Sequence, residues 1–210
     1  MKGGGEMELI EAIKQRRTVR DFSIDVVPLE IIEKALMAGL MAPSYNHLKQ
    51  WDFILVNEQS IRLALTQTEE MIEKVTDEMK QTFNDHDTLA KGMYLEAIPK
   101  QKRMILTAPE LLVVVYKPKT QVSESKIIYD LNCLASVWCC IENILLSLTE
   151  NQVFGVTFIP KNTYAIKKLL SIPQELEVAA IIPFGFKDSN AKIIPQKSVE
   201  LKSRLHISNW

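Results

Sequence analysis

The sequence has 210 residues, of which 47% are hydrophobic and 24% are charged. These values are typical of a folded globular protein and exclude a disordered or fibrous chain, and the length suits one domain. Lys and Arg number 25 against 26 for Asp and Glu, which gives a net charge of -1. Since no global field would hold such a chain on nucleic acid or on an anionic membrane, we predict neither as a partner and expect small molecules or a second copy.

The amino-terminal stretch MKGGGEMELIEAIKQRR has no apolar segment before its charges, so it predicts no secretory signal and favours the cytoplasm. Residues 1–6 contain consecutive glycines and are predicted to form a flexible leader, which leaves residues 7–210 as a single domain. The apolar stretch from Leu131 to Leu148 approaches membrane-spanning length, but Glu142 and Asn143 interrupt it. We interpret it as a buried helix.

Apolar residues at helical spacing indicate several helices. One starts near Leu9 and ends at the basic cluster that begins with Arg16, and a second starts at Pro28 and ends before Pro43. Residues 58–102 are charged and rich in Met, and they predict one or two amphipathic helices that cover another part of the molecule.

The segment from Lys126 to Thr149 is nearly apolar all round, which predicts a core helix that is buried on several sides and shared between subunits. Asn162 is a candidate N-cap for a short helix through Tyr164 to Leu170. Four runs rich in β-branched or aromatic residues predict strands: WDFILV (51–56), ELLVVVY (110–116), VFGVTFI (153–159) and LEVAAIIPFGF (176–186). Because strands and helices do not alternate regularly, we predict an α+β fold with helices on both sides of a sheet.

The carboxy-terminal tail from Asn190 to Trp210 shows no core-forming period, yet it carries several large apolar residues. Leaving these side chains in water would be unfavourable. We therefore predict that the tail wraps around a partner subunit.

Several common catalytic motifs are absent from the sequence, including G-x-G-x-x-G, the Walker loop, G-x-S-x-G and H-E-x-x-H. The histidines lie far apart: His47, His86 and His206. Cys133, Cys139 and Cys140 lack zinc-ligand spacing and are interpreted as reduced packing residues, although the adjacent pair leaves a vicinal disulfide open. We predict no metal site and assign no catalytic side chain.

Two polar segments are candidates for a binding site. QRRTVRDF places three arginines and a threonine within five residues, a set that can surround a phosphate because guanidinium groups bind its oxygens bidentately. A solvated basic helix end would have the same pattern. MAPSYNHLKQWDF offers donors and acceptors to a heteroaromatic ring, as a plain connecting loop also would. From the residues alone, both interpretations stay open.

Taken together and in this order, the two segments resemble the nitroreductase family. Its members carry R-R-S-x-R-x-F at the end of the first helix and A-P-S-x-x-N-x-Q-P-W one helix later, matched here by RRTVRDF (Arg16 to Phe22) and APSYNHLKQW (Ala42 to Trp51). Three later blocks extend the resemblance to about Met7 to Trp210: DLNCLASVWCCIENILLSL, VFGVTFIPKNTYAIKKLLSIP and AAIIPFGFKD. Five ordered blocks are more specific than any one motif.

The resemblance implies a nitroreductase-like fold, with a mainly antiparallel central sheet flanked by helices, and a homodimer with two FMN sites at its interface. The first motif is then expected to hold the phosphate and ribityl chain through Arg16, Thr18 and Arg20, with Arg17 contributing mainly backbone. The second motif is expected to come from the other subunit and lie along the isoalloxazine ring, through Pro43, Ser44, Tyr45 and His47.

Two further contacts with FMN follow from the same resemblance. A turn is expected to offer backbone N–H groups to the flavin near its N5 atom: Pro160, Lys161, Asn162 and Thr163. A late cation is expected to contact the phosphate, with Lys197 as the first candidate and Lys202 or Arg204 as alternatives.

The second motif departs from the family pattern at three positions. His47 stands where the family usually has Asn, Lys49 replaces Gln, and Gln50 replaces the Pro before Trp51. His47 could still donate a hydrogen bond, and when protonated it would favour the anionic reduced flavin. The loop therefore supports flavin binding and leaves the substrate open.

The activity that the resemblance implies is that of an FMN-dependent oxidoreductase. Hydride would pass from NADH or NADPH through the flavin to small electron-poor acceptors, such as nitroaromatics or quinones, by a ping-pong mechanism. The flavin carries this reaction, and the protein supplies orientation and electrostatics. Two alternatives stay open: a non-catalytic flavin-binding or redox-sensing protein, and a related flavin chemistry such as dehalogenation or flavin breakdown.

Overall fold

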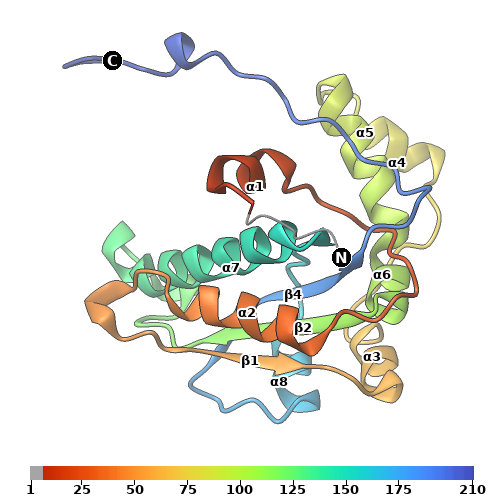
Figure 1. The fold of residues 1–210 in the computed structure, drawn as a ribbon, viewed down its shortest axis with the longest axis horizontal. Coiled ribbons are helices and arrows are strands. Elements are labelled where there is room, and N and C mark those ends of the chain that lie inside the picture. The colour runs from red at the N-terminus through yellow and green to blue at the C-terminus, as the bar shows by residue number, and fades with distance from the viewer. Residues whose placement is uncertain (1–6) are drawn as a thin grey trace.

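The structure is a computed structural model that describes residues 7–210 (Figure 1). The predicted leader, residues 1–6, lies outside the described residues. At the centre, four strands pair antiparallel in the order β1-β2-β4-β3. Their bounds are Trp51–Leu55 for β1, Glu110–Tyr116 for β2, Val153–Gly155 for β3 and Glu177–Phe186 for β4. The predicted α+β fold with a mainly antiparallel sheet is confirmed.

Helices cover both faces of this sheet. One face carries α2 and α7, and the other carries α3, α6 and α8 (Figure 1). The bounds of these helices are Leu29–Leu40 for α2, Gln59–Leu65 for α3, Gln101–Thr107 for α6, Asn132–Glu150 for α7 and Thr163–Leu169 for α8. The short helix α1, over Leu9–Gln15, contacts α7, and its end at the basic cluster agrees with the prediction.

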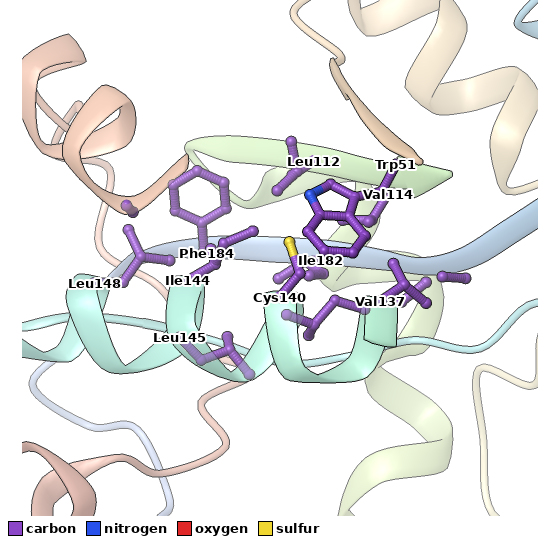
Figure 2. Close-up of a cluster of buried hydrophobic side chains, with 14 of the residues drawn as sticks. Trp51, Leu112, Val114, Val137, Cys140, Ile144, Leu145, Leu148, Ile182 and Phe184 are labelled. Carbon is purple, nitrogen blue, oxygen red and sulfur yellow. The ribbon is translucent and has the colours of Figure 1, made fainter. Parts of the chain in front are cut away.

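The alternation of side chains along β2 explains why this strand is apolar throughout, since successive residues point to opposite faces and both faces are covered. Leu112 and Val114 belong to the same cluster as Ile144 of α7 (Figure 2). Leu111 and Val113 belong to the cluster on the other face. The sheet therefore lies between two hydrophobic cores.

The strand predicted over 153–159 is shorter in the structure. β3 ends at Gly155, and pairing with β4 resumes only at an isolated bridge between Phe158 and Ile181. Pro183 of β4 accepts a hydrogen bond from the backbone N–H of Val156 but has no N–H to donate in return. The ladder is interrupted at this proline.

The region predicted to hold one or two helices over 58–102 contains more than that. Besides α3, it forms α4 (Asp77–Thr82) and α5 (Thr88–Ala97), and α6 begins at its end. The side chains of Thr76 and Asp87 each accept a backbone N–H hydrogen bond three residues later, which starts a new helix. The predicted number was wrong because these two caps divide the segment.

The long helix α7 begins later than predicted, after a 3-10 turn over Ile128–Leu131. Its buried residues form one face, and Trp138 and Cys139 are exposed on the rest of the helix. Within one chain α7 is therefore buried on one face, and its predicted sharing between subunits stays a prediction. The continuous helical stretch Ile128–Glu150 is apolar and long enough to cross a membrane, but 33% of its apolar window is buried within the fold, and core helices pass the same test.

The three cysteines are free thiols, so no vicinal disulfide is present in the structure. Cys140 is fully buried in the core, as expected for a packing residue, whereas Cys139 is exposed, contrary to that interpretation. The helix periodicity explains the difference, because neighbouring residues point about 100° apart.

After β4 the carboxy-terminal tail first passes α5, where Ile194 to Lys197 line a cavity with that helix, and then runs away from the body of the molecule as an extended segment with one 3-10 turn over Leu201–Ser203 (Figure 1). Large apolar side chains are exposed along it: Val199, Leu201, Leu205, Ile207 and Trp210. That this tail wraps around a partner subunit stays a prediction.

Candidate functional site

The residues predicted to hold a phosphate gather around one cavity of about 490 Å³, which we call the arginine cavity. The first motif contributes Arg16, Arg17, Thr18 and Arg20 to its lining, and the tail contributes Lys197. Residues of α5 and the tail segment before Lys197 complete the wall. The alternative cations Lys202 and Arg204 do not line this cavity. The structure thus joins segments that are nearly 180 residues apart in the sequence.

The local fold of the first motif explains this arrangement. α1 ends at Gln15, and the chain then runs without helix as far as the bridge between Phe22 and Lys187. Val19 is buried, and its backbone N–H contacts the carbonyl of Gly155 on β3. Anchoring Val19 inward leaves its two neighbours, Thr18 and Arg20, to face the cavity.

Each of three cations at the cavity is paired with a carboxylate from another element. Arg16 Nε lies 3.0 Å from Glu142 of α7, and Lys197 Nζ lies 3.0 Å from Asp87, the N-cap of α5. Arg20 pairs with Glu96 of α5 at 2.8 Å. Backbone hydrogen bonding from Ala90 and the Lys197 ammonium together hold the pKa of Asp87 below its usual value. Sequence reasoning missed all three carboxylates.

A second cavity of about 280 Å³, which we call the turn cavity, lies beside the first. Arg20 lines both cavities. The wall of the turn cavity includes the chain from Val156 to Ile159, Lys161 of the predicted flavin turn, and the carboxylate-bearing residues Glu69 and Glu70. The two cavities therefore meet at one guanidinium group.

The predicted flavin turn is held by side-chain hydrogen bonds. Asn162 caps α8 by accepting a hydrogen bond from the Ala165 N–H at 3.1 Å, which confirms the predicted cap, and its amide donates to the carbonyl of Thr68. Pro160 is buried, and Thr163 begins α8. The backbone N–H of Lys161 donates to Glu69 Oε1 at 2.9 Å. Of the four predicted turn residues, Lys161 lines the cavity.

In the folded structure, the second motif lies apart from both cavities. Ser44 and Tyr45 line a narrow space beside Trp51 and Ser136. The arginine cavity and the turn cavity are lined by none of the four predicted residues of this motif: Pro43, Ser44, Tyr45 and His47. The backbone N–H of Tyr45 donates to the Ser136 hydroxyl at 2.9 Å. A single chain therefore does not bring the two predicted halves of the site together.

The second motif has a strained backbone. Asn46, His47 and Lys49 adopt positive φ values of 50°, 57° and 45°, which cost a non-glycine residue roughly 1 kcal/mol or more each. The phenol oxygens of Tyr45 and Tyr129 lie 2.5 Å apart, and this contact raises the pKa of Tyr45. Such strain persists where surrounding contacts fix the loop, and it is often found at binding sites.

The model of the nitroreductase family matches residues 13–186, and the chain belongs to that family. The chain is 26% identical over 193 residues to the iodotyrosine deiodinase of Thermotoga neapolitana, covering 91% of this chain and 95% of the relative. It is 25% identical over 209 residues to a putative NADH dehydrogenase/NAD(P)H nitroreductase of Methanothermobacter thermautotrophicus, covering 98% and 89%.

Solved structures share the fold. An oxidised iodotyrosine deiodinase bound to FMN and 3-iodo-L-tyrosine superposes with a TM-score of 0.73 at 24% identity, covering 97% of this chain and 100% of that one. A putative NADH dehydrogenase/NAD(P)H nitroreductase from Parabacteroides distasonis gives a TM-score of 0.69 at 19% identity, covering 98% and 100%. These likenesses establish the nitroreductase-like architecture.

Proposed function

We propose that the protein is an FMN-dependent oxidoreductase that reduces small electron-poor molecules with NADH or NADPH. The observation that carries the proposal is the arginine cavity, where Arg16, Thr18, Arg20 and Lys197 converge. Guanidinium, ammonium and hydroxyl groups are the donors that a phosphate prefers. The donor set therefore fits the phosphate of FMN, and the turn cavity, which adjoins it at Arg20, would take the ring side.

The site is completed, on this proposal, by a second copy of the chain. The strained loop at Pro43 to His47 lies apart from the arginine cavity within one chain, so it would reach the flavin from the partner subunit. A further observation supports the dimer. An apolar groove of about 440 Å³ lies between α1, α2 and α7, on a surface that one chain leaves in water. Apolar surface of this kind favours association.

When bound, FMN supplies the hydride chemistry of the reaction. The residues of the chain bind and orient it. Arg16 and Lys197 would hold the phosphate, and the N–H group of Lys161 would face the ring once Glu69 releases it. Arg20 would place a positive charge near the developing negative charge of the reduced ring, which favours reduction. No side chain is assigned a proton-transfer role.

Flavin analysis of the purified protein tests the proposal. We expect FMN to bind at one molecule per chain and its absorbance to bleach anaerobically on addition of NADH or NADPH. Addition of a quinone or nitroaromatic should then restore the absorbance. Failure to bind FMN at micromolar concentration would refute the proposal, whereas binding without bleaching would identify a flavin-binding or redox-sensing protein.

Reductive dehalogenation is a second candidate, and the relationship to proteins named iodotyrosine deiodinase favours it. The turn cavity combines the carboxylates of Glu69 and Glu70 with apolar Met104 and Phe158, a mixture that suits an aromatic ligand with a charged group. In this reaction two electrons and a proton replace an aryl carbon–iodine bond by carbon–hydrogen and release iodide. Iodide release from 3-iodotyrosine, measured beside quinone reduction, distinguishes the two.

A further inference from the structure

Arg20 occupies a junction in the candidate site. Its side chain is 14% exposed, and it lines the arginine cavity, the turn cavity and a third, polar cavity that also contains Lys100 and Arg103. The residue belongs to a segment without regular secondary structure. Since a long side chain on such a segment has many rotamers, something must hold the guanidinium in place.

The carboxylate of Glu96 is that restraint. Glu96 lies on α5, its side chain is only 5% exposed, and its Oε2 accepts a hydrogen bond from a terminal nitrogen of Arg20 at 2.8 Å. Its other oxygen, Oε1, contacts the Lys100 ammonium. A carboxylate buried this deeply is found in proteins when it is paired with cations, as here.

The contacts of Glu96 belong to a larger ion network. Lys100 also contacts Asp21, which in turn contacts Arg103. Burial lowers the pKa of Lys100, but the hydrogen bonds that its ammonium donates to Asp21 and Glu96 outweigh this effect and raise that pKa above its usual value. The network thus contains three cations, Arg20, Lys100 and Arg103, and two carboxylates, Asp21 and Glu96. Of these two carboxylates, Glu96 contacts Arg20.

A purely structural arginine has a different environment in this chain. Arg62 is also buried, but each of its three guanidinium nitrogens donates a hydrogen bond to a backbone carbonyl, namely that of Val56, Ala108 or Pro109. For Arg20, by contrast, Glu96 is the only hydrogen-bond acceptor among residues 7–210. The other donors of the Arg20 guanidinium remain available to a ligand.

We propose that Glu96 is a positioning residue for the cofactor: by holding Arg20 from α5, it fixes the guanidinium where the arginine cavity and the turn cavity meet and thereby sets the affinity for FMN. This inference rests on the proposed FMN site. It also makes α5 part of that site, although no residue of α5 belongs to a recognised motif. A fixed guanidinium loses less entropy on binding than a free one, which is the physical basis of the effect.

A double-mutant cycle on FMN affinity tests the inference. The apoprotein is titrated with FMN, monitored by quenching of flavin fluorescence, for the wild type, Glu96→Ala, Arg20→Ala and the double variant. We expect Glu96→Ala to weaken FMN binding roughly tenfold in the wild type and by no more than about twofold when Arg20 is already absent. A matched control is Glu73→Gln, because Glu73 also pairs with a lysine, Lys102, but lines neither cavity.

The outcomes are separable. Equal losses from Glu96→Ala in both backgrounds, or no loss in the wild type, would overturn the positioning role. Absence of FMN binding by the wild type would instead refute the proposed function. If Glu96→Ala does not fold, Glu96→Gln takes its place in the same cycle, since the amide oxygen keeps an acceptor while the charge is lost, and a loss that depends on Arg20 is again required.

Discussion

The backbone N–H of Lys161 and the carboxylate of Glu69 form a hydrogen bond of 2.9 Å across the turn cavity. In the proposed function this N–H group faces the flavin ring. The carboxylate of Glu69 therefore occupies a donor that the cofactor needs. Binding of FMN must displace it, and the displacement costs part of the binding free energy.

We accordingly predict that Glu69→Ala binds FMN about threefold more tightly than the wild type, since a competing acceptor is removed. The measurement is the dissociation constant from flavin fluorescence. Glu70→Ala is the matched control, because Glu70 lines the same cavity without a hydrogen bond to the turn. Weaker binding by Glu69→Ala than by Glu70→Ala would show that Glu69 assists the cofactor rather than competing with it.

Arg16→Ala should weaken FMN binding by about tenfold or more and leave riboflavin binding nearly unchanged, because riboflavin lacks the phosphate. The loss should shrink at high salt, as expected for partly exposed charges. Arg17→Ala provides the comparison. Its guanidinium donates to the carbonyl of Arg16, so we expect a change of no more than about twofold. Equal losses for FMN and riboflavin would count against a phosphate contact at Arg16.

Arg62 is expected to contribute to the stability of the fold and not to FMN binding. Burial lowers the pKa of its guanidinium, although the nearby Glu110 carboxylate partly offsets this effect. Arg62→Met would leave three buried carbonyls without donors and should reduce the free energy of unfolding by roughly 3 kcal/mol. Chemical denaturation measures this value, with exposed Lys80→Met expected within about 0.5 kcal/mol of the wild type. FMN affinity of the folded variant should not change, and a large loss would contradict the structural role.

The cysteines of α7 report on the proposed dimer. Burial, together with the neighbouring Cys139, raises the pKa of Cys140 to about 12, so this thiol stays protonated and unreactive at neutral pH. Exposed Cys139 should react with maleimide when the protein is dilute and become protected as the concentration rises, since dimer formation covers the outer surface of α7. Cys139→Ser should abolish this signal. Labelling of Cys139 that does not depend on concentration would argue against an interface across α7.

The strands were predictable because local sequence determines them. β2 and β4 are long runs of mostly apolar residues at the centre of the sheet, and their bounds agree with the prediction to within one residue. The interruption of β3 was not predictable, because it depends on Pro183 in a different strand. The segment 58–102 was predicted to form only one or two helices, because the capping residues Thr76 and Asp87 look like ordinary polar residues in a charged segment.

The candidate site was predictable in part. Arg16 and Arg20 of the first motif line one cavity together with Lys197, the first candidate for the late cation. Their partners, Glu142, Asp87 and Glu96, were missed because a single carboxylate carries no sequence signal for a cation far away in the chain. Glu96, for example, pairs with a residue 76 positions earlier. The contribution of Pro43 to His47 from a second subunit stays a prediction, since it depends on how two chains meet.

The central claim is that the arginine cavity holds the phosphate of FMN, and calorimetric titration of the apoprotein with FMN and with riboflavin tests it most directly. We predict one FMN per chain, bound at least about a hundredfold more tightly than riboflavin, because several charge-assisted hydrogen bonds reach the phosphate. Equal affinities for the two ligands, or no binding of FMN, would contradict the assignment of this cavity.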